Sequence, residues 1–194
     1  MRKTITVLLI IIFLAFSLHA EACVGKVLSI GILNSPDEQI SAEILSVLIN
    51  ERTGTAVNIK YYKDPKDLYS AIKKGEVGML IENTDRAMEI LGRQRPNDIR
   101  KAYEIAKEEF SRNLNLVWLN PFGSLTGAEG KGQRYYSPVI TADVLNNFPA
   151  LPRLINKLGG IMDEEIFSRM IKTVKSGEKP RKIARDFLKA KRLI

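Results

Sequence analysis

The sequence predicts an α/β protein with a mainly parallel open sheet and helices on both faces, resembling a single lobe of a larger fold. Short apolar segments alternate with longer segments whose apolar residues recur at helical spacing. Glycine, proline and aspartate stand at the junctions, where they begin or end helices. The alternation of strand and helix favours parallel strands joined by crossover helices.

The first unit shows the pattern most clearly. Val27 to Leu33 (VLSIGIL) is short, apolar and followed by turn formers, as is typical of a buried strand. Ser35 is placed to cap the next helix, Pro36 suits its first position, and the two acidic residues that follow suit its positive end. Gly54 is expected to end that helix.

The remaining elements follow by the same reasoning. We expect strands at 56–61, 77–81 and 116–119, and helices at 64–74, at 84–91 and from Asn97 or Asp98 to about Phe110. Residues 120–134 show little strand or helix signal, which is uncommon for so long a connection in a compact domain. After it we expect a strand at 135–140 and helices at 141–147, 151–158, 163–175 and 180–192.

The N-terminus has the features of an export signal. Arg2 and Lys3 precede an apolar run from Ile5 to Phe16, and the small residues of Ala20-Glu21-Ala22 suit signal peptidase. We therefore interpret residues 1–22 as a signal peptide and 23–194 as one domain, located in the periplasm or tethered to the extracytoplasmic side of a membrane. The alternative is an uncleaved anchor. Cys23 would begin the mature chain and is a candidate for lipidation, although the residues before it are atypical of lipoprotein sites.

The exported part has few groups suited to catalysis. His19, the only histidine, lies in the signal segment, and Cys23 is the only cysteine. Ser-His-Asp and Cys-His catalysis and thiolate or histidine zinc sites are therefore excluded. No glycine-rich nucleotide-binding motif follows a strand, so we expect no cofactor. These absences favour a binding protein over an enzyme.

The chain is basic, with a net charge of +8. Without Arg2, Lys3 and Glu21 the charge is +7. The basic residues are densest near the C-terminus, where they form either a solvated helix face or a surface for anionic lipid or an acidic partner. Nucleic acid is not an expected partner of an exported chain.

Polar residues follow three of the predicted strands, at 34–39, 82–85 and 120–122. In open α/β sheets, ligands bind beyond the carboxyl ends of the strands. We therefore expect the ligand site at this edge.

Five segments resemble the substrate-binding subunits of glycine betaine/choline/carnitine ABC importers, which are type II periplasmic binding proteins. GILNSPDEQISAEIL resembles the first strand and turn of the family, and LYSAIKKGEVGMLIENTDRAM resembles A-L-K-S-G-E-I-D-L-Y-P-E-Y-T-G-T-A. LVWLNPFG resembles L-V-W-L-D-P-A-P, YYSPVITADVLNNFPAL resembles the region around Y-Y-P-A-P-V-V, and IARDFLKAKRLI resembles the family's ending. The segments occur in the family's order from the first strand to the last residue.

The resemblance implies a solute-binding component of an osmoprotectant importer, which works with an ABC transporter membrane subunit. Family members have two lobes, and the second is inserted where this chain has only residues 120–134. The chain thus resembles lobe one alone, with weakened or altered binding of a quaternary ammonium or similar small molecule. The alternative is a non-transport interaction module that homodimerises, or docks on a membrane partner, through the face left open.

The resemblance also places candidate ligand-binding residues. Arg86, which stands where the family has a second threonine, would repel a cation unless it points away or pairs with Asp85. Trp118 is expected in the core, and Glu82 either orders a loop or contacts ligand. The candidate ligand residues, each with packing or capping as its alternative role, are Gln39, Asn83, Thr84, Phe122, Tyr135 and Tyr136.

Overall fold

The computed structural model describes residues 27–127 and 132–194, and this part of the chain alternates strands and helices. The strands are β1 (Val27–Leu33), β2 (Ala56–Tyr62), β3 (Met79–Asn83), β4 (Leu116–Trp118), β5 (Gly123–Thr126) and β6 (Gln133–Thr141). The helices are α2 (Pro36–Thr53), α3 (Pro65–Lys73), α4 (Thr84–Ile90), α5 (Ile99–Leu114), α6 (Ala142–Asn147), α7 (Leu151–Ile155), η3 (Asn156–Leu158), α8 (Glu164–Lys175) and α9 (Pro180–Ala190). The export segment and Cys23 lie outside the described residues.

The strands form one sheet in the order β2-β1-β3-β6-β4, with β5 also paired to β6. β1 is parallel to β2 and β3, whereas β6 is antiparallel to β3, β4 and β5. Among the described strands, β6 alone therefore runs against the others. The predicted mainly parallel sheet is confirmed, with one reversed strand inside it.

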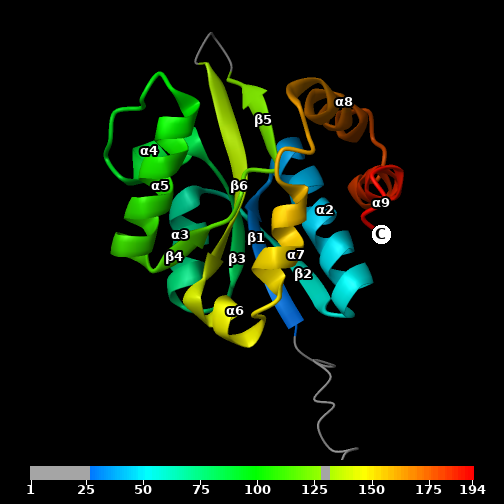
Figure 1. Cartoon of the computed structure of the whole chain (residues 1–194), viewed down its shortest axis with the longest axis horizontal. Helices are drawn as coiled ribbons and strands as arrows, with labels where there is room; N and C mark the ends of the chain where they lie inside the picture. The colour runs from blue at the N-terminus through cyan, green and yellow to red at the C-terminus, as the bar shows by residue number, and fades with distance from the viewer. Residues whose placement is uncertain (1–26, 128–131) are drawn as a thin grey trace, which may run out of the picture.

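Helices cover both faces of the sheet (Figure 1). On one face, α2, α7, α8 and α9 contribute to one apolar core. On the other face, α3, α4 and α5 pack over a second core around Phe110 and Trp118. α2 is apolar around most of its circumference because the sheet covers one side and α8 and α9 cover another.

The helix boundaries follow the predicted local signals. Gly54 ends α2 in a left-handed conformation with φ 70°. Asp64 and Asp98 cap α3 and α5 by accepting hydrogen bonds from backbone N–H groups of the first turn. Ser35 precedes α2 without making a side-chain cap. α5 is longer than predicted and ends at Leu114; it is followed by Asn115, whose left-handed φ of 54° asparagine tolerates well.

The connection at 120–134 is more regular than predicted. β5 lies within it and pairs with the first half of β6, which starts at Gln133 rather than at Tyr135. β5 and the start of β6 rise beyond the carboxyl ends of β1 and β3 (Figure 1). A Cβ at Gly123 would lie 3.1 Å from the Phe167 ring, so glycine allows β5 to approach α8 closely.

Within the described residues, no helix has the length and apolar content needed to cross a lipid bilayer.

Candidate ligand site at the carboxyl ends of the strands

The predicted ligand edge is built where β1 and β3 end and where α2 and α4 begin. Leu33 ends β1 two residues before the Ser35 that precedes α2, and Asn83 ends β3 directly before α4. Asn83 accepts a hydrogen bond from the backbone N–H of Arg86 at 3.0 Å, which caps α4. Asn83 therefore starts α4, whereas Ser35 makes no side-chain cap for α2.

A buried charge network ties this edge together. Arg86 Nη1 lies 2.6 Å from Glu38 Oε1, and Arg86 Nε lies 2.6 Å from Glu82 Oε1. Arg86 Nη2 also donates to the carbonyl of Ile81 at 2.6 Å. The other oxygens accept from protein donors too: Tyr69 Oη bonds Glu82 Oε2, and the Leu33 N–H bonds Glu38 Oε2. Arg86 thus points into the protein, where it joins α2, β3 and α4.

The network contains two carboxylates and one guanidinium. This composition and its burial shift the pKa values of the groups in it. Burial raises the pKa of Glu38 above its ordinary value of 4.5, and the attraction of Arg86 offsets this only in part. Burial lowers the pKa of Arg86, but Glu82 and Glu38 more than reverse this effect and keep the guanidinium charged. Burial and then the neighbouring Glu82 raise the pKa of Tyr69 well above 10.

The contacts of this network show which of the alternative roles Arg86 and Glu82 have. Arg86 points away from the edge, which was one of the two alternatives. It pairs with Glu38 and Glu82 rather than with Asp85. Asp85 instead lies 2.6 Å from Arg95 Nε. Glu82 orders the local backbone, since it also accepts from the Asn83 N–H at 2.7 Å.

Three of the candidate ligand residues are polar, and two of them are committed to the protein. Asn83 is buried in its capping role. Thr84 is also buried, and its hydroxyl accepts from the backbone N–H of Tyr135 at 3.2 Å. Gln39 is half-buried, and its amide donates to the exposed Asn34 at 2.8 Å. Gln39 and Asn34 therefore remain accessible.

The three aromatic candidates differ in exposure. Phe122 and Tyr136 are buried, at 1% and 0% exposure, and both stack edge-on against Phe167. Tyr135 is half-buried and packs edge-on against Tyr103 with ring centroids 6.3 Å apart. The sheet brings all three rings to one edge but leaves only Tyr135 with accessible surface.

Two residues next to Tyr136 were not among the candidates. The Tyr136 hydroxyl donates to Asp37 Oδ2 at 2.7 Å, and the Arg134 guanidinium lies 5.5 Å from the centre of its ring. Burial and then Asp37 raise the pKa of Tyr136 well above 10. Side chains two positions apart on a strand share a face, so the sequence could have predicted that Arg134 lies beside Tyr136. It could not have predicted the contact with Asp37, which lies 99 positions away from Tyr136.

The hairpin of β5 and β6 is held on both sides. Glu164 of α8 accepts from the Thr126 N–H at 3.0 Å and from the Gln133 amide at 3.2 Å. Hydrogen bonds from the Thr126 side chain, the Gln133 side chain and the Thr126 N–H, in that order, lower the pKa of Glu164 below its ordinary value of 4.5. On the other side, Arg95 donates to the Gln133 carbonyl. The hairpin is therefore fastened to α8 and to the α4–α5 connection.

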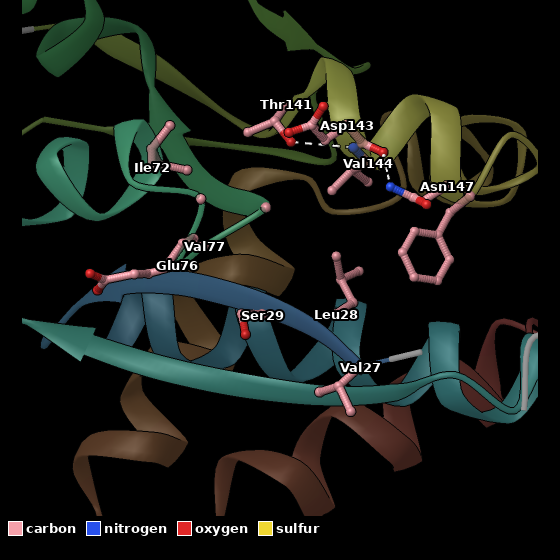
Figure 2. A pocket seen from close by; sticks show the side chains of 13 residues that line it. Val27, Leu28, Ser29, Ile72, Glu76, Val77, Thr141, Asp143, Val144 and Asn147 are labelled. Carbon is pink, nitrogen blue, oxygen red and sulfur yellow. Dashed lines mark hydrogen bonds between the residues drawn. The ribbon is translucent and has the colours of Figure 1, made fainter. Parts of the chain in front are cut away.

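Four pockets that the described residues form all lie away from this edge. One has a volume of about 190 Å³ and lies at the opposite end of the sheet, where β1 starts and β6 ends (Figure 2). The others lie between α5 and β4, beside Thr53 and Leu151, and between α8 and α9. None of the six candidate ligand residues lines these four pockets. The described ranges also contain no group of three or more His, Cys, Asp or Glu arranged to hold a metal ion.

The packing confirms the expected burial of Trp118 and shows where the C-terminal basic residues lie. Trp118 is 2% exposed and stacks edge-on against Phe110 and Tyr103 in the second core. The C-terminal basic residues lie largely on an exposed helix face. Two of them also fasten α9 to α2, since Arg181 pairs with Glu43 at 3.3 Å and Arg185 with Glu51 at 2.8 Å.

Comparisons with known proteins identify the fold. No protein-family model matches the sequence, and no curated protein matches it. Among solved structures, a glycine betaine/carnitine/choline ABC transporter protein aligns with a TM-score of 0.74 and 15% identity, over 86% of this chain and 99% of that chain. Apo YehZ from Escherichia coli aligns with a TM-score of 0.74 and 11% identity, over 88% and 100%. An ABC-transporter choline binding protein in complex with choline gives a TM-score of 0.59 at 9% identity, over 85% and 88%. This chain therefore has the α/β fold of a single lobe of a periplasmic binding protein, and its structural neighbours include glycine betaine, carnitine and choline ABC transporter proteins.

Proposed function

We propose that this protein is the exported solute-binding component of an importer for quaternary ammonium or similar small molecules. The observation that carries the proposal is the edge where β1 and β3 end. It keeps the side chains of Asn34, Gln39 and Tyr135 accessible on a rigid sheet. The same fold occurs in the choline-binding protein and the glycine betaine/carnitine/choline transporter protein described above.

The accessible groups suit a small organic cation that carries a polar end. The half-buried ring of Tyr135 offers an aromatic face, which attracts a cation that has no hydrogen-bond donors. Asn34 and Gln39 bond each other at 2.8 Å, and their amides can exchange this bond for bonds to a ligand. Arg86 does not oppose the cation, because its charge is neutralised by Glu38 and Glu82 inside the protein.

We further propose that binding is weaker than in two-lobed relatives. A ligand on one lobe is covered on one side only, whereas ligand sites normally enclose most of the ligand surface. In this proposal the short β5–β6 connection stands where the second lobe is inserted in the family. Residues 1–22 direct export, Cys23 is the point of membrane attachment if it is lipidated, and an ABC membrane subunit is the partner.

The alternative, an interaction module that dimerises through an apolar open face, receives little support. The exposed large apolar side chains among the described residues are Val27, Tyr61 and Ile90. Val27 starts β1 at the opposite end of the sheet, Tyr61 lies near the carboxyl end of β2, and Ile90 ends α4. These positions belong to three different elements, and the edge itself is largely polar.

A thermal-shift panel tests the proposal on protein that lacks residues 1–22. Betaine, choline, carnitine and proline are added at millimolar concentrations, with sodium chloride at equal ionic strength as the control. A ligand at ten times its Kd stabilises the folded state by about 1.4 kcal/mol, which raises the Tm by roughly 3–6 °C for a chain of this size. A flat response to all four compounds would contradict the proposal.

A further inference from the structure

The last two helices carry most of the net charge of the chain. Residues 164–194 contain ten basic and four acidic side chains, a formal net charge of +6. Residues 23–163 contain eighteen basic and seventeen acidic side chains, a net charge of +1. α8 and α9 lie outside α2 on one side of the molecule (Figure 1), so the excess charge is gathered on one surface. We call the surface of residues 164–194 the α8–α9 face.

The acidic side chains of the α8–α9 face already have partners within the protein. Glu164 accepts hydrogen bonds from β5 and β6. Glu165 lies 4.0 Å from Arg169, and Lys182 lies 2.8 Å from Glu178 and 3.6 Å from Asp186. The two arginines that fasten α9 to α2 are paired as well. These contacts account for four of the ten basic side chains.

The other six basic side chains are exposed, and none of them forms an ion pair with a residue that the structure describes. Three lie around the turn between α8 and α9, and three lie at the far end of α9. The two groups are separated by the length of α9, about 16 Å for its 11 residues. With the two α2 glutamates also counted, the surface keeps a formal charge of +4. The six side chains are Lys172, Lys175, Lys179, Lys189, Lys191 and Arg192.

Helix stability does not explain this charge. Lysines in the last turn of α8 and α9 interact favourably with the helix dipoles. Lys179, however, stands at the start of α9, where the dipole disfavours a positive charge. Like charges gathered on one surface also repel one another. A partner with many negative charges would relieve this repulsion.

We infer that the α8–α9 face is a docking surface for a membrane that contains anionic phospholipids. The inference goes beyond the proposed solute binding, since it assigns a second surface, and it rests on the proposed export for the membrane that the chain meets. Lysine and arginine side chains near an anionic bilayer each add to the attraction. Two charged groups at the ends of one helix allow α9 to lie along the bilayer surface.

The kind of charge favours a bilayer over a protein or a small anion. Five of the six unpaired side chains are lysines, which are depleted at protein–protein interfaces. Lysine is a flexible point charge, whereas arginine supplies the fixed fork suited to a defined carboxylate or phosphate. The six charges are also spread along the helix and do not converge on one point. If Cys23 is lipidated, the α8–α9 face supplies the second of the two signals that stable membrane anchoring takes.

Vesicle co-sedimentation tests the inference on protein that lacks residues 1–22, so that neither the export segment nor a lipid anchors the chain. Vesicles of phosphatidylcholine alone are compared with vesicles that also contain phosphatidylglycerol. We expect binding only to the second kind. Binding should be lost when sodium chloride is raised from about 0.1 M to about 1 M, because the Debye length falls from about 10 Å to about 3 Å.

Two triple variants neutralise the two groups of unpaired side chains separately. One carries Lys172→Gln, Lys175→Gln and Lys179→Gln, and the other carries Lys189→Gln, Lys191→Gln and Arg192→Gln. Each should weaken binding to anionic vesicles at least about tenfold. Asp186→Asn removes an exposed acidic residue from α9 and should strengthen binding by up to about fivefold. The Tm of each variant shows that it is folded.

The matched control removes the same number of charges from the opposite face of the sheet. Lys66, Lys73 and Lys74 are exposed on α3 or directly after it, and α3 packs on the second core. Their joint replacement by glutamine should change binding by less than about twofold, because these charges lie beyond the Debye length from the bilayer.

Four results would overturn the inference: equal binding to both kinds of vesicle, an unchanged affinity of either triple variant, an equal loss in the α3 control, or binding to soluble polyglutamate without binding to vesicles. The third would show that only net charge matters, and the fourth would assign the α8–α9 face to an acidic protein. The thermal-shift panel fails independently of this test, since the panel contains no lipid and the vesicle assay contains no solute ligand.

Discussion

Two arginines at the same edge of the sheet are placed in opposite ways. Arg86 is buried between two glutamates, and every charged group around it has protein partners. Arg134 lies over an aromatic ring on the hairpin, and its Nε has no hydrogen-bond partner in the described part of the chain. The first arginine is part of the architecture, because it fixes α2, β3 and α4 to one another. The second contacts the ring of Tyr136, two positions further along the same strand.

The largest effect should come from breaking the buried network. Arg86→Met removes the only positive partner that the structure shows for Glu38 and Glu82 and leaves two carboxylates buried together. We expect the free energy of unfolding to fall by roughly 3–5 kcal/mol. Urea unfolding measures the loss. Arg112→Met is the matched control, since Arg112 forms an exposed pair with Glu108 and should change stability by less than about 0.5 kcal/mol.

A loss for Arg86→Met as small as that for Arg112→Met would show that the network does not hold the edge together. It would also remove the contrast between the two arginines.

A smaller effect should appear in how the free energy of unfolding depends on pH. Burial raises the pKa of Glu38 above 4.5, so the folded state binds this proton more tightly than the unfolded state does. The stability that Glu38 contributes is therefore fully present below about pH 4.5 and is lost as the pH rises through the folded pKa. Glu38→Gln removes this loss. Its free energy of unfolding, minus that of the wild type, should increase between pH 4.5 and 7 in urea titrations.

Glu108→Gln, which replaces an exposed glutamate on α5, is the control for the loss of a carboxylate at the surface. If the Glu38→Gln difference stays constant or decreases with pH, the two carboxylates are better compensated than their contacts indicate.

The two arginines also show what the sequence could and could not predict. Local sequence signals predicted most elements. Pro36, Gly54, Asp64 and Asp98 each mark an end of the helix to which they are adjacent in sequence. The partner of Arg86 in α2 could not be predicted, since Glu38 lies 48 positions away and depends on the sheet to reach it. Asp85 was the nearer candidate in sequence, but it pairs with Arg95 instead.

The hairpin shows a similar limit. β5 has the sequence GSLT, which contains few strand-forming residues and gains its structure by pairing with β6 and packing on α8. Because β5 was not predicted, the face of β6 was not fixed either, and Tyr135 and Tyr136 could not be told apart. The pairing turns Tyr136 inward and leaves Tyr135 at the surface.

The central claim is that the accessible edge, with Tyr135 on it, binds a small organic cation. The most direct measurement is a calorimetric titration of the wild type and Tyr135→Ala with the compound that gives the largest thermal shift. Phe187→Ala, which removes a half-buried aromatic ring from α9, serves as the control. The account predicts that Tyr135→Ala weakens binding about tenfold while Phe187→Ala leaves it unchanged. Equal affinities of Tyr135→Ala and the wild type would contradict the claim.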